Sequence, residues 1–235
     1  MSALISIKTT SISSLLRYWI SQIVDKETIT WLDEKQEQIK SSVTGREFFI
    51  TFSMVSRYVV KDQLQLTPED LKAASTLHTD WFPGHWSVEQ SARTILVLAL
   101  PKDDIEKYLS TLEQVFTSAD VGELVALYQA LPLLPFPERW QKRAAEGVRS
   151  NMTAVFNAIA LRNPYPAKYF DSLAWNQMVL KALFVGSPLN LIQGLDARMN
   201  QELARMLVDY AQERLSAKRS VSAELWRLVE LINCQ

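Results

Sequence analysis

The residues of this sequence that could do chemistry are amides and amines set among apolar side chains in its second half. The stretch NPYPAKYFDSLAWNQMVLKA, residues 163–182, leads from two prolines and two tyrosines into a run that holds Asn176, Gln177 and Lys181. A buried amide without a partner costs about 1–3 kcal/mol, so Asn176 needs hydrogen bonds. Carbonyls of the Pro164–Pro166 turn are the favoured partners, because most buried polar groups bond to the chain itself. A ligand that also contacts Lys181 or Gln177 is the alternative.

A helix expected over residues 172–185 must position these groups. At about 100° per residue, Gln177 and Lys181 fall on a narrow polar strip, while Asn176 falls between leucines. Apolar residues occupy most of the remaining circle. We therefore expect this helix to be buried nearly all round, with Asn176 pointing inward.

A second long helix, expected over 196–216, separates into an apolar stripe and a charged stripe. The charged stripe is typical of a solvated face with ion pairs at spacings of three and four, and it consists of Arg198, Glu202, Arg205, Asp209 and Gln212. Asn200 and Arg214 break this pattern, because they project onto the apolar side. An inward arginine needs a carboxylate or carbonyls, so Arg214 is a candidate binding residue. The alternative is an interaction with the C-terminal end of its own helix.

A third helix is expected to run unbroken over 137–161, through Gly147. One side of it would carry Arg143, Glu146, Arg149, Thr153 and Asn157. The other side is apolar, and Asn151 would point inward with it. Glu146 between two arginines is typical of a surface network, although at a groove it could bind an anionic or polar ligand.

Metal and cofactor chemistry finds little support in the sequence. His78 and His85 lie on either side of Pro83-Gly84, seven residues apart, which is not the spacing of a helical metal site. The single cysteine, Cys234, cannot form a disulfide or a cysteine-based metal site within one chain. The sequence also lacks the glycine motifs of nucleotide-binding proteins and the usual serine-hydrolase and metalloprotease motifs. We predict no metal, no cofactor and no assignable catalytic residue, which favours a protein that is not an enzyme.

The overall composition limits the classes of protein to which this chain can belong. The chain has 235 residues, of which 48% are hydrophobic, and a net charge of −1. It can therefore bury a large core, and it lacks the basic excess of nucleic-acid-binding domains. Its longest plain apolar run, at 95–100, is far below the ~20 residues of a membrane span, and Arg17 interrupts any signal-peptide-like stretch. We expect a soluble cytoplasmic protein, peripheral to the inner membrane only through a partner.

Helix signals recur along the chain, and no segment alternates as a strand would. Thr67 with Asp70, and Ser87 with Gln90, have the spacing of capping boxes. Helices are expected near 12–24, 28–42, 45–60, 68–77, 88–99, 102–116, 120–130, 137–161, 172–185, 196–216 and 222–232. Short links between amphipathic helices favour an all-α solenoid of helical hairpins, like HEAT or armadillo repeats, with an irregular multi-helix bundle as the alternative. We expect one domain over 1–235, with a seam near 131–137.

Several stretches in the second half resemble proteins of the EboA-domain family. They are LPLLPFPERW, RAAEGVRSNMTAVFNAIALRNPYPA, AWNQMVLKALF, GLDARMNQELARMLVDYAQER and ELWRLV, in this order over roughly residues 125–230. The resemblance implies an all-helical protein of unassigned biochemistry. It also implies a gene cluster with a TatD-like hydrolase, a UbiA-like prenyltransferase and sugar-phosphate-type enzymes. Such clusters are associated with making or exporting secondary-metabolite precursors, including the scytonemin monomer.

The resemblance supplies no catalytic residues, and the chain departs from the family pattern at three positions. Gln212 stands where His is common, Leu215 where Trp is common and Ala223 where Pro is common. This favours a non-enzymatic scaffold or binding module that serves biosynthesis or export of a secondary-metabolite precursor. Its partners would be other proteins of the same metabolic cluster and a small-molecule metabolite.

The alternative is an enzyme acting on a small aromatic or lipid-linked metabolite through a polar pocket in the C-terminal half. Lys181 or Glu146 would then serve as the acid, base or electrostatic group. In either case, we assign ligand or partner binding to Arg149, Asn151, Asn157, Asn163, Tyr165, Asn176, Lys181, Asn200 and Arg214.

Overall fold

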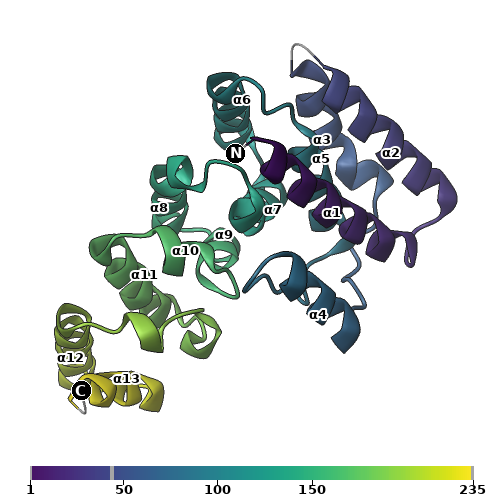
Figure 1. The fold of residues 1–235 in the computed structure, drawn as a ribbon. Coiled ribbons are helices and arrows are strands. Elements are labelled where there is room, and N and C mark those ends of the chain that lie inside the picture. Colours follow the sequence, from purple (N-terminus) through teal and green to yellow (C-terminus); the bar gives the residue numbers. More distant parts are fainter. Residues whose placement is uncertain (1, 43–44, 234–235) are drawn as a thin grey trace. The chain divides into compact units, whose positions relative to one another are not determined.

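The computed structural model describes residues 2–42 and 45–233, and the side chains of residues 12–42 and 45–231. Within this part the chain forms thirteen α-helices and four short 3-10 helices without any β-sheet, which confirms the predicted all-α class. Cys234 lies outside the described residues. The chain divides into two compact units, Met1–Pro137 and Glu138–Gln235 (Figure 1). The single domain with a seam near 131–137, and the choice between solenoid and bundle, stay predictions.

The N-terminal unit is built around one buried helix. Its helices are α1 (Ser2–Ser21), α2 (Lys26–Ser41), α3 (Arg46–Tyr58), α4 (Pro68–Leu77), α5 (Val88–Ala99), α6 (Ile105–Ser118) and α7 (Val121–Ala130), followed by the 3-10 helix η1 (Leu131–Leu133). Helices α1, α2, α3 and α7 all pack against α5, and ten of the twelve residues of α5 are buried. The apolar run at 95–100 is therefore the end of a central helix.

Side chains cap the starts of α2, α4, α5, α6 and α7 and satisfy free N–H groups there. Capping boxes form at Thr67–Asp70, Ser87–Gln90 and Asp120–Glu123. The first two confirm the predicted boxes. Asp25 and Asp104 accept hydrogen bonds from the backbone N–H groups of Thr28 and Lys107. Each cap of this kind contributes about 1 kcal/mol.

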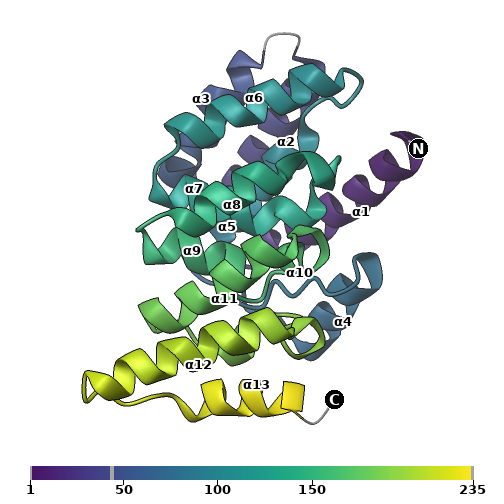
Figure 2. The same cartoon turned by 90° about the vertical axis from the view of Figure 1, so that its left-hand side faces the viewer.

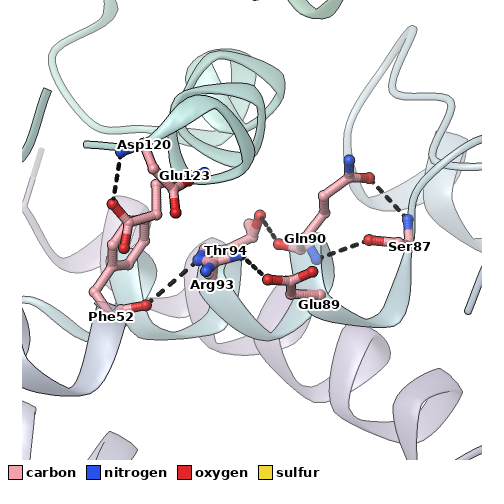
Figure 3. A network of polar contacts seen from close by, with 8 residues as sticks. All are labelled: Phe52, Ser87, Glu89, Gln90, Arg93, Thr94, Asp120 and Glu123. Atoms are coloured by element: carbon pink, nitrogen blue, oxygen red, sulfur yellow. Dashed lines mark hydrogen bonds and ion pairs between the residues drawn. The ribbon is translucent and has the colours of Figure 1, made fainter. Parts of the chain in front are cut away.

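One cation, Arg93, is buried inside the N-terminal unit, with a relative exposure of 2%. Its guanidinium pairs with Glu89 at 2.5 Å and donates to the carbonyl oxygen of Phe52 at 3.3 Å. It also lies 5.5 Å from the centre of the Phe52 ring. Figure 3 shows the guanidinium between Phe52 and Glu89, so Arg93 links α5 to α3 inside the core.

The C-terminal unit consists of shorter helices that pack mainly on their neighbours in the chain. They are η2 (Pro137–Trp140), α8 (Gln141–Arg149), α9 (Thr153–Ala160), α10 (Tyr165–Tyr169), α11 (Ser172–Val185), η3 (Leu189–Leu191), η4 (Asp196–Arg198), α12 (Gln201–Ser216) and α13 (Ala223–Asn233). Helix α8 packs on α9, α9 on α11, α11 on α12, and α12 on α13. Figure 2 shows α12 and α13 lying side by side at the C-terminal end.

The prediction of one unbroken helix over 137–161 is wrong. The chain passes through Gly147 as helix but leaves it at Ser150, the C-terminal cap of α8. The Ser150 hydroxyl accepts a hydrogen bond from the N–H of Met152 at 3.1 Å, a local bond that competes with helix continuation. Asn151, expected to point inward, is therefore exposed in the bend between α8 and α9.

Two other helix starts also differ from prediction. The helix expected over 12–24 begins at Ser2 in the structure. The sequence pattern did not indicate this earlier start, because residues 8–11 are polar. The helix expected over 196–216 begins at Gln201, and Asn200 is its N-terminal cap. An asparagine side chain at this position accepts from the third residue of the helix, so it does not belong to either face.

Helix α11 has the predicted bounds, but the prediction that it is buried nearly all round is wrong. Trp175, Met178 and Val179 are fully buried, whereas Leu173 is 66% exposed and Phe184 is 77% exposed. These two residues are eleven positions apart, about three helical turns, and so share one face. The helix is thus packed on one side only.

Candidate functional site

Asn176 is buried as predicted, but its partner is an amide and not the Pro164–Pro166 turn. Its side-chain nitrogen donates to the Asn200 side-chain oxygen at 3.2 Å, and the Asn200 nitrogen donates back at 2.9 Å. The same Asn200 oxygen accepts from the N–H of Leu203 at 2.9 Å. This reciprocal pair fixes the start of α12 against the middle of α11.

Lys181 bonds a different part of the unit. Its amine donates to the carbonyl oxygens of Val148 and Ser150 at 2.5 and 2.7 Å, and it lies 5.2 Å from the centre of the Phe156 ring. Burial lowers the pKa of Lys181. The amine thus compensates the negative C-terminal end of α8, just where the chain bends.

Arg198 does not belong to the solvated ladder in which the sequence pattern placed it. Its guanidinium donates to the carbonyl oxygens of Pro166 at 2.9 Å, Ala167 at 3.2 Å and Phe170 at 2.9 Å. It also lies 4.6 Å from the centre of the Trp175 ring. Burial lowers the pKa of Arg198, opposed by the nearby charge of Asp171. Arg198 lies before Asn200, the N-terminal cap of α12, and so outside the helix that carries the ladder. The capping residue was the signal in the sequence that could have shown this.

The rest of that ladder is a surface network, as predicted. Arg205 pairs with Glu202 at 2.6 Å and with Asp209 at 3.2 Å, and all three side chains are largely exposed. Arg214 donates to the carbonyl oxygen of Ser220 at 2.8 Å and lies near Tyr210, with 5.8 Å from the guanidinium to the ring centre. The Ser220 carbonyl belongs to the segment that follows α12, so Arg214 ties this segment to the last turn of the helix.

The other predicted site residues divide into buried and exposed groups. Asn163 donates to the carbonyl oxygen of Ala158 and accepts from the N–H of Tyr165, both at 2.9 Å. Burial raises the pKa of Tyr165 above its usual range. Asn157 accepts a hydrogen bond from the Ser187 hydroxyl at 2.6 Å. By contrast, Arg149 and Asn151 are exposed.

The described contacts join the predicted site residues to several different partners. The structure pairs Asn176 with Asn200, but it directs Lys181 and Arg214 to separate backbone carbonyls. These contacts hold short helices together, which is a structural task. A role of the same residues in ligand or partner binding stays a prediction.

A pocket of about 320 Å³ lies in the N-terminal unit, where residues near the end of α2 and the start of α3 meet the start of α6. This volume is at the lower end of the range of small-molecule sites. Its lining is apolar at Ile39, Phe48, Leu100, Pro101 and Tyr108, and polar at Lys40, Ser41, Ser42, Asp103, Asp104, Lys107 and Thr111, with Gly45 between them. Sequence reasoning missed this site, because it joins two segments far apart in the chain.

Gly45 shapes one wall of this pocket. Its φ of +70° lies in the left-handed region, which favours glycine. A Cβ at this position would lie 3.4 Å from the Thr111 side chain, in ordinary contact, so the strain of a larger residue would come from the backbone. Glycine here allows α3 to begin directly beside α6.

The described residues show neither a metal-binding cluster nor a helix that could span a membrane. Among the side chains that the structure describes, no group of three or more His, Cys, Asp or Glu residues could hold a metal ion. None of the helices in the described part combines the length and hydrophobicity that a membrane span requires.

Comparison with known proteins gives one family. A family model described as metabolite traffic protein EboA matches residues 12–230. The match covers most of both units, whereas the resemblance seen in the sequence was confined to roughly 125–230. No curated protein and no solved structure matches the chain.

Proposed function

The chain belongs to the EboA family, and on this premise we propose that it is a non-enzymatic binding module for a small metabolite. It serves biosynthesis or export of a secondary-metabolite precursor, of the scytonemin-monomer type, alongside other proteins of the same metabolic cluster. It works in the cytoplasm, and a partner makes any contact with the inner membrane. The family description supports the metabolite part of this proposal.

The observation that carries the proposal is the pocket beside α2, α3 and α6. Its volume of about 320 Å³ suits a small molecule. Its lining combines apolar residues, which can contact the body of a ligand, with charged residues, which can orient it. Binding and release of a metabolite require nothing more than these contacts.

The enzyme alternative rested on Lys181 or Glu146 in the C-terminal unit. The Lys181 amine is held by the carbonyl oxygens of Val148 and Ser150. Glu146 pairs with Arg143 at 2.9 Å, and its side chain is 52% exposed. A general acid or base must reach the reacting atom of a bound substrate. The present partners of both groups instead support structural roles.

Native mass spectrometry of the protein, purified gently from its own host, tests the proposal. A small molecule that copurifies at defined stoichiometry supports metabolite binding, and its mass identifies the ligand. A protein that copurifies without a small molecule supports the scaffold form of the proposal and identifies the partner. A monomer that carries neither contradicts it.

The substitution Asn176→Leu separates structural from functional roles in the C-terminal unit. We expect it to lower the free energy of unfolding by about 1–3 kcal/mol, because it removes two hydrogen bonds between the buried position 176 and the half-buried amide of Asn200. Copurifying molecules should be retained. Gln177→Leu, at the exposed neighbouring position, is the control. Unchanged stability with lost ligand or partner would show that the amide pair belongs to the binding site.

A further inference from the structure

Helix α11 leaves one face uncovered, and this face carries apolar side chains. Leu173 is 66% exposed, Phe184 is 77% exposed, and Leu180 between them is half-buried. The three residues fall within about 40° of one another around the helix, so they form a single stripe, the α11 stripe. We propose that the α11 stripe is the docking site for an acidic amphipathic helix of a partner protein. The inference goes beyond the proposed function and does not depend on the N-terminal pocket.

The dimensions of the α11 stripe suit one helix. At 1.5 Å per residue, the eleven steps from Leu173 to Phe184 span about 17 Å, or three helical turns. Helix α11 packs against both α9 and α12, and Figures 1 and 2 both show it between these two helices. The uncovered surface is therefore long and only one helix face wide. An amphipathic helix fits such a surface with apolar residues spaced by three and four positions.

Two cations lie beside the Phe184 end of the stripe, on the side of α8 and α9. Lys181 precedes Phe184 by about one turn. Its amine donates to the carbonyl oxygens of Val148 at 2.5 Å and Ser150 at 2.7 Å, which are the two neighbours of Arg149 in the chain. The backbone of Arg149 is thereby held next to the Lys181 amine, and the Arg149 side chain is exposed.

A third cation lies on the side of α12. The Tyr210 hydroxyl donates to the carbonyl oxygen of Leu183 at 3.4 Å, and the Arg214 guanidinium donates to the Tyr210 hydroxyl at 3.5 Å. Two hydrogen bonds thus connect Arg214 to the residue directly before Phe184. The exposed ring of Phe184 therefore has positive charge on both of its sides.

These three cations lack acidic partners. Within the described part of the chain, no carboxylate pairs with Arg149, Lys181 or Arg214. Glu146, one turn before Arg149, pairs with Arg143 at 2.9 Å instead. The C-terminal unit as a whole has 13 lysines and arginines against 9 acidic residues, a net charge of +4. Charge complementarity therefore favours a partner with acidic residues beside its apolar ones.

The charges also decide against a symmetric contact and orient the partner. In a twofold dimer the same patch faces itself, so the cations around Phe184 would meet those of the second copy, which is unfavourable. At the other end of the stripe, Asp171 caps the start of α11 and places a negative charge near Leu173. The partner helix should therefore carry its acidic residues at the end that lies over Phe184.

Photocrosslinking in the protein's own host tests the inference. The photoreactive amino acid p-benzoylphenylalanine replaces Phe184, and mass spectrometry identifies the crosslinked peptide. We expect a segment of another protein whose apolar residues recur at spacings of three and four, with Asp or Glu beside them at one end. The same photoreactive residue at Tyr18, which is 55% exposed in the N-terminal unit, is the control and should not reach this segment.

Every other outcome of the crosslinking overturns the inference. A crosslink to lipid would indicate a membrane surface, and a crosslink to this chain would indicate self-association. A partner segment without acidic residues, or no crosslink at all, would show that the charges around Phe184 do not select an acidic helix. The pocket of the N-terminal unit and its metabolite are tested separately, so none of these results bears on them.

The crosslinked segment, made as a peptide, then measures the contribution of each group. In titrations of the full chain, Phe184→Ser and Arg149→Glu should each weaken peptide binding by at least roughly tenfold. Lys72→Glu, at an exposed position of α4, should leave it unchanged. Added salt should weaken binding to the unmodified chain, because the attraction is partly between charges. An unchanged melting temperature shows that each variant is folded, and equal affinity in all three variants overturns the inference.

Discussion

Both units of the molecule cap helix starts with local side chains, and the C-terminal unit adds long-range bonds to helix ends. In the N-terminal unit, side-chain oxygens at Thr67, Ser87 and Asp120 close the starts of helices through capping boxes. In the C-terminal unit, Asp171 and Asn200 likewise cap the starts of α11 and α12. In addition, Lys181 and Arg198 satisfy carbonyls at the ends of helices, from 28 to 33 residues away in the chain. These long-range bonds to helix ends distinguish the C-terminal unit.

Helix length explains this difference. Helices α8, α9 and α10 contain nine, eight and five residues. Helices shorter than about 12–15 residues are marginal in water, so they depend on packing and on bonds from elsewhere. Lys181 ties the end of α8 to α11, and Arg198 ties the end of α10 to η4. The contrast shows that a polar side chain inside a helical unit can serve to hold neighbouring helices together.

The largest expected effect tests the core of the N-terminal unit. Arg93→Met should lower the free energy of unfolding by about 3–5 kcal/mol, because it leaves Glu89 and the Phe52 carbonyl without their buried partner. Urea unfolding measures the loss, and hydrogen exchange should show it chiefly in α3 and α5. Arg57→Met, at an exposed position of α3, is the control. A change below about 1 kcal/mol would contradict the structural role of this cation.

The next effect tests the long-range bonds of the C-terminal unit. Arg198→Met should cost about 2–3 kcal/mol, through three lost hydrogen bonds and the contact with Trp175. Arg205→Met, within the exposed ladder, should cost less than about 0.5 kcal/mol. Urea unfolding of the two variants compares them directly. Equal losses of unfolding free energy in the two variants would show that Arg198 belongs to the solvated face.

A smaller effect tests the local caps. Ser87→Ala should lower the free energy of unfolding by about 1 kcal/mol, because the N–H of Gln90 loses its hydroxyl acceptor at the start of α5. Ser53→Ala, on the exposed face of α3, provides the reference in the same urea series. If Ser87→Ala cost as much as Arg198→Met, the distinction between local and long-range bonds would fail.

The smallest effect concerns the open face of α11. Phe184→Ser should change the free energy of unfolding by no more than about 0.5 kcal/mol, because this side chain is 77% exposed. Phe156→Ala, at a fully buried position of α9, should cost about 3–5 kcal/mol in the same measurement. Similar losses would show that Phe184 is packed.

The limits of sequence reasoning follow the same division. Capping boxes at Thr67 and Ser87 were predictable, because both partners lie three residues apart and the chemistry is local. The Asn176–Asn200 pair was not, because a helical projection shows that an amide faces inward without showing which residue 24 positions away meets it. The pocket was missed for the same reason, since Phe48 and Asp103 meet only in the folded chain.

The amide pair between α11 and α12 has one consequence for conditions far from neutral pH. Neither Asn176 nor Asn200 can ionise, and their mutual hydrogen bonds join neutral groups, so salt screens no charge between them. The hydrogen bond from Arg205 lowers the pKa of Glu202 on the outside of α12, so this ion pair weakens in acid, when Glu202 takes up a proton, and it is screened in concentrated salt. The hydrogen bonds that attach α12 to α11 should therefore persist in acid and in concentrated salt, whereas the ion pair on the surface of α12 weakens.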